Sequence, residues 1–325
     1  MQLFRLLLVG CLFTWNGNGA VGQETTDPNP PQQKVDLRHK TSVIDPQLLQ
    51  NFIKQIAKGE LDATSKEFEE LLRKEPNWDY RLVVHLELMK AYEKAENRVK
   101  AGEHAQAALN IHLESVERQP ELLGRLVPRI SKALIGAGKE ALAAAQVTKA
   151  LDDLCSTVAS SEDRWVKAQI SKVRSLVALS QNSAAGASLK KLEEETRAAH
   201  DAEPTATSAL LHRLDALEVA IECDQLSVEG QTASWKAEYQ KLFAVAMSKA
   251  PEDFAILERV AKAEISTLRK DAAKDGRGEP SRVANLKSLL ESASPTDQGQ
   301  KNRLKLLQRQ FQQIENRAQA LKTNE

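Results

Sequence analysis

The chain has 325 residues, with 45 basic and 45 acidic side chains and a formal net charge of zero at pH 7. This balance argues against a nucleic-acid-binding protein, which would carry a strongly basic surface. Hydrophobic residues make up 42% of the chain but aromatic residues only 4%, a profile that favours packed helices over β-sandwiches. We therefore expect an all-α protein.

Residues 1–22 are typical of an export signal. They begin with a positive charge, continue with a short apolar run, LLLVGCLFTW, and end with the small residues Ala20 and Gly22. The apolar run is too short for a membrane helix, which needs about 20 such residues. The sequence predicts cleavage before Gln23 and an exported protein, periplasmic or secreted, with no membrane span.

The same segment has a second interpretation. LVGC, at 8–11, is similar to a bacterial lipobox, in which Cys11 would become the lipidated first residue. If the signal is removed, only Cys155 and Cys223 remain. Each lies among apolar residues at helical spacing, so we expect two small buried hydrophobes rather than a disulfide. Two isolated cysteines also make no metal site.

Order is expected to begin near Asp45. Residues 23–44 include the proline-rich run TTDPNPPQQK and hold too little apolar surface to order themselves. Asp45 then caps a helix that has proline at its first position and Gly59 at its end. Another helix follows, and Pro76 stops it. The first two helices therefore form an antiparallel hairpin.

Apolar residues at helical spacing continue to the C-terminus, and no period-2 strand pattern occurs. Turns between the predicted helices are too short for a crossover, so neighbours must pack antiparallel. The predicted helices cover about 79–97, 100–118, 120–137, 139–160, 162–181, 184–201, 205–226, 232–249, 252–274, 281–293 and 298–321.

The hairpins share a pattern of small and aromatic residues. Tyr92 lies four residues after Leu88, and Ala101, Ala105 and Ala108 follow it at helical spacing. This pattern resembles the tetratricopeptide repeat (TPR). Other hairpins match parts of the same signature, through Gly59, Phe68 and Pro76; through Gly138, Ala143, Val147 and Ala150; and through Tyr239, Phe243, Ala246 and Pro251. The alanine face lets a neighbouring helix approach closely, and Tyr92 is expected to fill the groove so formed.

The resemblance implies a TPR-like α-solenoid of antiparallel helix hairpins, a right-handed superhelix, over residues 45–251. Residues 252–325 form a C-terminal helical region. The repeat spacing is irregular: Phe68, Ala105, Val147, Leu192 and Phe243 occupy roughly equivalent places at intervals of 37, 42, 45 and 51 residues, whereas the family repeat has about 34.

The last predicted helix has an apolar seam at alternating steps of three and four residues, formed by Leu304, Leu307, Phe311, Ile314, Ala318 and Leu321. Such a seam requires another helix. It either caps the last hairpin, as solenoids require at their ends, or joins two chains as a homodimer.

The resemblance also implies a partner, because the first helices of TPR pairs commonly bind an extended peptide or a protein. Some members clamp a C-terminal carboxylate, and Arg125 and Arg129 match the clamp's basic positions. Leu49, Ile53 and Glu87 stand at its other polar positions. We expect a candidate peptide-binding groove for an acidic segment, formed by Lys90, Lys94, Arg125, Arg129 and Lys132.

Charge is unevenly distributed along the neutral chain. Residues 193–229 carry a balance of minus eight, and residues 259–325 a balance of plus six. The two regions either attract each other or face partners, unless they are simply solvated helix faces.

No catalytic or metal-binding pattern occurs in the sequence, whether nucleophile elbow, P-loop, H-E-x-x-H or zinc finger. His104 and His112 lie two helical turns apart, too far to share an ion, and His85, His200 and His212 have no partner at a metal-binding spacing. We expect no cofactor and a non-catalytic scaffold. Two other classes remain open: an α/α-barrel enzyme acting on polysaccharide, which would need stacked aromatics and a carboxylate pair, and a self-assembling envelope structural or assembly factor.

Overall fold

The computed structural model describes residues 44–59, 63–114, 116–117, 119–227, 230–275 and 280–322. Within these ranges the chain forms thirteen α-helices and one short 3-10 helix, with no strand, so the predicted all-α fold is confirmed. The expected signal peptide at 1–22 and all but the last residue of the 23–44 linker lie outside the described residues. The described chain divides into two compact units at Val260 and Ala261.

The first unit contains α2 to α11 and the start of α12. The bounds are α2 (Pro46–Lys58), α3 (Ala63–Lys74), α4 (Trp78–Lys94), α5 (Arg98–Leu113), α6 (Glu121–Gly136), α7 (Glu140–Thr157), α8 (Asp163–Ala178), α9 (Asn182–Ala202), α10 (Thr207–Glu222), η2 (Asp224–Leu226), α11 (Gln231–Lys249) and α12 (Phe254–Asp275). Most predicted boundaries agree closely with these. The exceptions are the ends of α5 and α10, each predicted too late because apolar residues continue into the turn.

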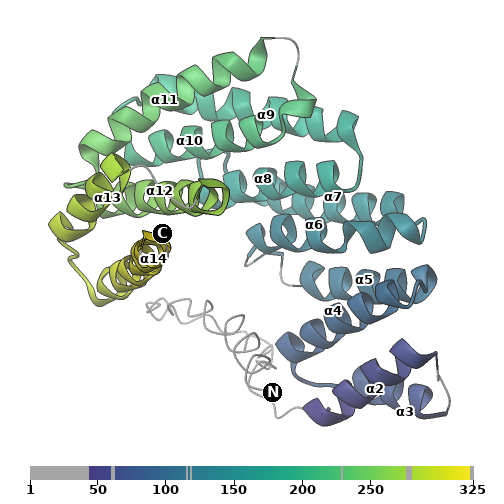
Figure 1. The fold of residues 1–325 in the computed structure, drawn as a ribbon. Helices are drawn as coiled ribbons and strands as arrows, with labels where there is room; N and C mark the ends of the chain where they lie inside the picture. The colour runs from purple at the N-terminus through teal and green to yellow at the C-terminus, as the bar shows by residue number, and fades with distance from the viewer. Residues whose placement is uncertain are drawn as a thin grey trace, which may run out of the picture. The chain divides into compact units, whose positions relative to one another are not determined.

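Helices of the first unit stack in chain order as hairpins (Figure 1). Each of the first helices α2, α4, α6 and α8 packs against the first helix of the next hairpin, and α4, α8 and α10 also pack against their own second helices α5, α9 and α11. One apolar cluster extends from Ile44 to Ala185. This continuous row of antiparallel hairpins is the architecture of an α-solenoid.

Three hairpin turns of this unit have the same geometry. Glu96, Gly138 and Ser180 follow α4, α6 and α8 with φ of 57°, 67° and 61°, in the left-handed region. The N–H of the next residue then donates to the carbonyl five residues earlier, from Asn97 to Tyr92 (2.9 Å), from Lys139 to Leu134 (2.8 Å) and from Gln181 to Leu176 (2.8 Å). These bonds cap the helix C-terminus in the manner of a Schellman motif. The turns recur at one constant interval, because Gly138 lies midway in sequence between Glu96 and Ser180.

The same interval relates the small residues of the second helices. Ala101, Ala143 and Ala185 lie in the first turns of α5, α7 and α9, and each is at most 1% exposed. The structural repeat is therefore longer than that of the TPR family, which has about 34 residues. It also corrects one predicted equivalence, because the residue one interval after Val147 is Leu189, rather than Leu192.

Small residues allow two close helix approaches. A Cβ atom on Gly102 of α5 would lie 2.2 Å from the Ala137 Cβ, and one on Gly124 of α6 would lie 3.0 Å from Ser171 of α8. The predicted role of the alanine face is confirmed in the same region, since Ala105 and Ala108 are fully buried. Close approach of this kind needs side chains without bulk.

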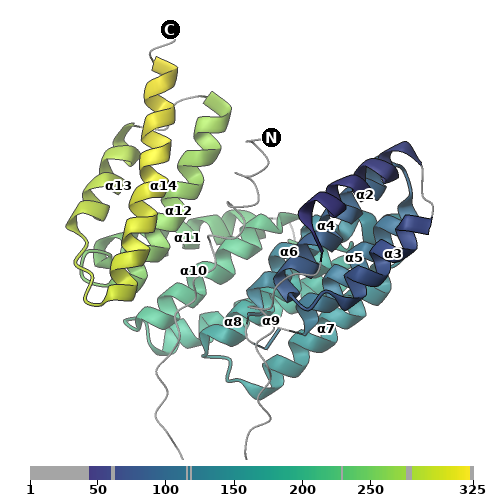
Figure 2. The ribbon, with the colours of Figure 1, turned by 90° about the horizontal axis from the view of Figure 1, so that it is seen from below.

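The second unit contains the remainder of α12 with α13 (Pro280–Ser292) and α14 (Gln298–Lys322). α13 packs against α14 (Figure 2). The predicted seam of α14 lies inside the single chain, because Leu304, Leu307, Phe311 and Ile314 are each at most 8% exposed. An apolar seam that is already covered offers little surface for a second chain, so dimerisation through α14 stays a prediction without structural support.

Candidate functional site

The five predicted groove residues lie on the exposed faces of two neighbouring first helices. α4 carries Lys90 and Lys94, and α6 carries Arg125, Arg129 and Lys132. The opposite face of α6 is buried, because residues three and four apart share one helix face. Since α4 packs against α6, all five belong to adjacent helices of one layer. We call these residues the α4–α6 basic surface.

Most of the positive charge on the α4–α6 basic surface has no internal counter-charge. Lys90 forms an ion pair with Glu87 at 2.8 Å. Within the described part of the chain, no ion pair joins Lys94, Arg125, Arg129 or Lys132 to a carboxylate. The surface therefore presents four cations whose charge is available to a ligand.

Two arginines of the following first helices are already paired with carboxylates. Arg174 of α8 contacts Glu222 of α10 at 2.6 Å, and Arg259 of α12 binds both Asp215 and Glu218 of α10. Burial alone would lower the pKa of Arg259, but the two carboxylates raise it above its usual value. These pairs reduce the free positive charge of α8 and of the start of α12.

The carboxylate clamp that the resemblance implied does not form at the matching positions. Leu49 is only 6% exposed, Ile53 packs against the core, and Glu87 is engaged by Lys90. Only Arg125 and Arg129 remain accessible. A clamp of this kind holds a C-terminal carboxylate with polar side chains from three successive first helices. Here only one of the three helices, α6, supplies them.

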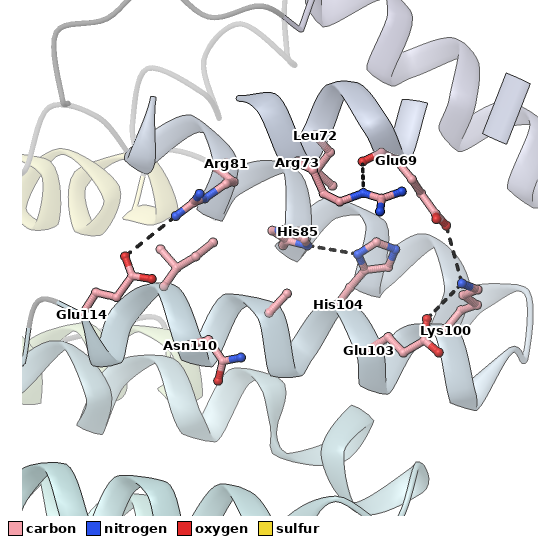
Figure 3. Close-up of a pocket in the computed structure, with 12 residues that line it drawn as sticks. Glu69, Leu72, Arg73, Arg81, His85, Lys100, Glu103, His104, Asn110 and Glu114 are labelled. Atoms are coloured by element: carbon pink, nitrogen blue, oxygen red, sulfur yellow. Dashed lines mark hydrogen bonds and ion pairs between the residues drawn. The ribbon is translucent and has the colours of Figure 1, made fainter. Parts of the chain in front are cut away.

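A groove of about 430 Å³ lies elsewhere in the unit, between α3 and α5 with α4 at its floor (Figure 3). Ion pairs cross it near both ends: Lys100 contacts Glu69 at 3.5 Å and Glu103 at 2.9 Å, and Arg81 contacts Glu114 at 3.9 Å. Arg73 completes three cations against three carboxylates. This α3–α5 groove is therefore close to neutral and does not favour an acidic ligand.

Two histidines meet at the floor of the α3–α5 groove. Their Nδ1 atoms are 3.0 Å apart, and the Tyr92 ring stacks on His104 with centroids 5.4 Å apart. Burial lowers the pKa of His85 to about 3 and that of His104 to about 4, so both are neutral at pH 7. One Nδ1 then donates its proton and the other accepts it.

This pair was not evident from the sequence, because its two histidines lie on different helices. His85 lies before the turn at Glu96 and His104 after it, on antiparallel helices, and that placement on the two sides of one short turn is the signal that would have brought them together. No cluster of three or more histidine, cysteine, aspartate or glutamate side chains able to hold a metal occurs among the described residues. The pair is thus a hydrogen-bonded element of the hairpin.

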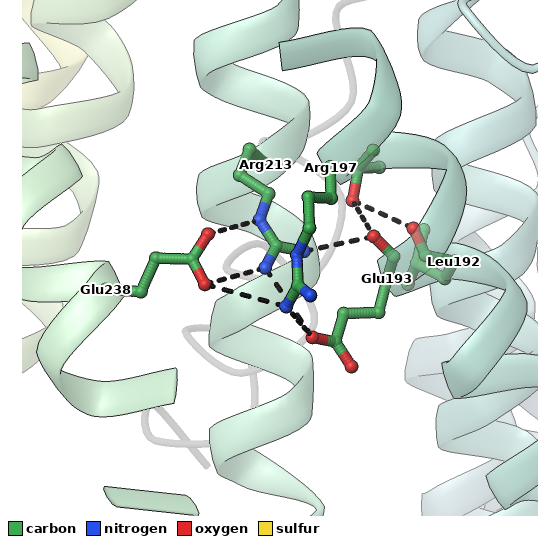
Figure 4. Close-up of polar contacts among 6 residues, drawn as sticks. Leu192, Glu193, Arg197, Arg213 and Glu238 are labelled. Carbon is green, nitrogen blue, oxygen red and sulfur yellow. Dashed lines mark hydrogen bonds and ion pairs between the residues drawn. The ribbon is translucent and has the colours of Figure 1, made fainter. Parts of the chain in front are cut away.

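Much of the predicted acidic stretch at 193–229 is also engaged internally (Figure 4). Arg213 of α10 is fully buried and donates to both carboxylate oxygens of Glu238, at 2.7 and 2.8 Å, and to the Glu193 carbonyl at 3.1 Å. Arg197 binds the Glu193 carboxylate. Together with the pairs of Asp215, Glu218 and Glu222, these contacts engage part of the stretch, whereas Glu195, Asp201 and Glu203 stay exposed.

Two tryptophans and two cysteines that other functions could use are buried or half-buried. Trp165 and Trp235 are each 3% exposed, so neither can stack on a sugar ring. Cys155 and Cys223 are free thiols; Cys223 is buried, as expected, whereas Cys155 is half-buried. Burial raises the pKa of both, and Gln169 donates to the Cys155 sulfur at 3.3 Å. Neither has the exposed, electropositive setting of a reactive cysteine.

Comparison with known proteins adds no identity. No protein-family model matches the sequence, and no curated protein is detectably similar to it. Among the described helices, none has the length and apolar character needed to cross a membrane.

Proposed function

We propose that this protein is an exported, non-catalytic scaffold, a TPR-like helical-repeat protein in a broad sense, which binds an acidic protein segment on the α4–α6 basic surface. The observation that carries the proposal is that four exposed cations of this surface, all except Lys90, form no ion pair with a carboxylate of the described chain. Export rests on the signal-like features of residues 1–22 and the cleavage expected before Gln23.

Helix geometry supports an extended ligand. Arg125 and Arg129 lie one helical turn apart, at about 6 Å along the axis from a rise of about 1.5 Å per residue. Alternate side chains of an extended peptide are about 7 Å apart. Acidic residues at alternate positions therefore match the spacing of the α6 cations, and the fork-shaped guanidinium groups suit carboxylates.

An apolar contact is also available beside these cations. Ile135 of α6 is 42% exposed and lies three residues after Lys132. A hydrophobic residue in the ligand that covers Ile135 would contribute affinity, because removing apolar surface from water is favourable. The preferred ligand is thus an acidic segment with an apolar residue at one end.

An enzyme of the α/α-barrel class is less well supported. A sugar cleft needs exposed aromatic rings, and Trp165 and Trp235 are buried. Among the polar groups described above, the histidine pair is neutral and occupied by its own hydrogen bond. A binding surface requires none of these groups.

The test is a binding titration with a labelled peptide of alternating glutamate and serine ending in leucine, added to the chain from Gln23 onward. Arg125→Glu with Arg129→Glu should weaken binding at least about tenfold, since each lost charge-assisted contact contributes up to a few kcal/mol. Raising the salt concentration should also weaken it.

A matched control makes the same change of charge on α11. Lys236 and Lys241 are both exposed, and reversing them should change the affinity less than about threefold, because exposed charges beyond a Debye length are screened. Equal losses in the two double variants, or no loss in either, would show that the α4–α6 basic surface is not the binding site.

A further inference from the structure

The second unit contains a cleft of about 530 Å³, which is formed by other residues than the α4–α6 basic surface. It lies between α12 and α14, and the described residues that line it are Lys262, Ile265, Ser266, Arg269, Lys270 and Gln310. Three of these six side chains are cations and none is a carboxylate. The cleft therefore presents positive charge and hydrogen-bond donors to whatever enters it.

The positive character of the cleft follows from the way α12 distributes its charges. Glu264 and Asp271, on α12, both pair with Arg282 of α13, at 3.2 and 3.8 Å. Arg269 and Lys270 remain exposed, and no ion pair joins either to a carboxylate in the described part of the chain. One side of α12 is thus neutralised by α13 while the side toward α14 stays basic.

The cleft also has apolar parts. Ile265 lies within the lining and is only 2% exposed, so it provides an apolar floor between the cations. On α14, Leu306 precedes Gln310 by one helical turn and is 47% exposed. Residues four apart share a helix face, which places Leu306 beside the α14 wall of the cleft. A ligand that touches both helices meets charge on one side and an apolar side chain on the other.

The length of the cleft sets the size of the ligand. Lys262 and Lys270 are eight residues apart, about 12 Å by helix rise, which is the length of roughly four residues of extended chain. A single carboxylate or phosphate would reach only one end. A short extended segment with acidic residues at alternate positions can contact Arg269 and Lys270 and continue along the rest of the cleft.

We propose that the α12–α14 cleft is a second docking site, which binds an aspartate- or glutamate-rich protein segment through Arg269 and Lys270 and an apolar residue of that segment through Leu306. The site is separate from the α4–α6 basic surface. It does not depend on that surface being a binding site.

The experiment uses the chain from Gln23 onward with Arg125→Glu and Arg129→Glu already in place, so that the first surface no longer contributes. A peptide of alternating glutamate and serine ending in leucine carries a fluorophore and a photo-crosslinking group. Arg269→Glu with Lys270→Glu should lower its affinity at least about tenfold. Crosslinks should map to α12 and α14.

The matched control reverses Lys287 of α13 and Lys301 of α14, which are exposed and lie outside the cleft lining. It makes the same change of net charge in the same unit and should alter affinity less than about threefold. Leu306→Ser should weaken the leucine-bearing peptide and leave a peptide without leucine unaffected. Circular dichroism of each variant should match the parent.

Three results would overturn the proposal: equal losses in the cleft and control variants, crosslinks outside α12 and α14, or binding of polyphosphate or anionic vesicles to the cleft in place of the peptide. Failure of the first proposal gives a different result. In that case Arg125→Glu with Arg129→Glu has no effect in the otherwise unchanged chain, while the cleft variants still lose peptide.

Discussion

The histidine pair shows how one buried contact makes stability depend on pH. His85 and His104 stay neutral because burial, with the charges of His104 and Arg81, lowers the pKa of His85 to about 3, and because burial lowers that of His104 to about 4. Glu69 and Glu103 oppose the effect on His104, whereas Lys100 adds to it. In the unfolded chain both imidazoles titrate near 6.5.

Between pH 6.5 and about 4 the unfolded state therefore binds protons that the folded state does not, so stability falls as the pH falls through this window. The slope is at most about 1.4 kcal/mol per pH unit for each histidine. Replacing both residues by glutamine, which forms hydrogen bonds but does not titrate, should reduce the slope of the free energy of unfolding measured in urea between pH 6.5 and 5.

Part of the slope should survive in the double variant, because burial also lowers the pKa of His112 to about 4. Adding His112→Gln should remove that remainder. At pH 8 all three imidazoles are neutral in both states, so comparison at that pH separates any packing cost of the substitutions from titration. An unchanged slope in the double variant would contradict the assignment.

At the scale of the element, the buried Arg213 joins three helices. α10 supplies Arg213, α9 the Glu193 carbonyl, and α11 the Glu238 carboxylate. Burial alone would raise the pKa of Glu238, but the hydrogen bond and charge of Arg213 lower it overall. Removing one member of such a pair leaves a buried charge without its partner.

Glu238→Ala should therefore lower the free energy of unfolding by about 3 kcal/mol, at the low end of the usual range of about 3–5 kcal/mol, because the Glu193 carboxylate remains 3.6 Å from the guanidinium. Adding Arg213→Met should recover most of that loss, since no charge is then left buried.

Glu70→Ala is the control. The pair of Glu70 with Lys74 is exposed to solvent at both ends, so its loss should change the free energy of unfolding little. Equal losses for both alanine variants would show that burial does not set the cost.

The helices themselves were largely predictable from the sequence, because apolar spacing and short turns depend on local residues. Asp45, Pro46 and Gly59 correctly delimited α2. The contacts between helices were less predictable. Arg213 lay in what was interpreted as an acidic stretch, and nothing in the sequence marks Glu238, on α11, as its partner. The same holds for His85 and His104, whose proximity depends on the turn between them.

For the candidate site, the sequence identified the exposed cations of α4 and α6 but not which of them are free. Lys90 is paired within its own helix, which helical spacing would have predicted, whereas the positive character of the α12–α14 cleft depends on Arg282 reaching back to α12. Surface charge can be counted from a sequence. Its neutralisation by neighbouring helices cannot.

At the scale of the whole molecule, the three equivalent turns predict which shortened chains fold. Deleting residues 139–180 joins Gly138 to Gln181 and restores the same turn, with α9 in the place of α7 and α10 in the place of α8. In a solenoid each hairpin contacts only its neighbours. The shortened chain should therefore keep its helical content per residue and unfold cooperatively, by circular dichroism in urea.

The comparison is a deletion of 139–172, which removes the length of one repeat of the TPR family, about 34 residues. It would join Gly138 to the middle of α8 and lose the turn, so helical content and cooperativity should both fall. If the 139–172 deletion were tolerated and the 139–180 deletion not, the interval between the recurring turns would not be the repeat unit.

The recurrent turn has a consequence for how this protein can be extended. One additional residue inside α8 would rotate the part of the helix after it by about 100°, since a helix has about 3.6 residues per turn, so the capped end at Ser180 would no longer align with the face of α8 that packs against α6. Between hairpins the backbone has no such bond to keep, as at 158–162 and 203–206. Those two connections are where a tag, a reporter or a whole foreign domain can be spliced in without disturbing the stack.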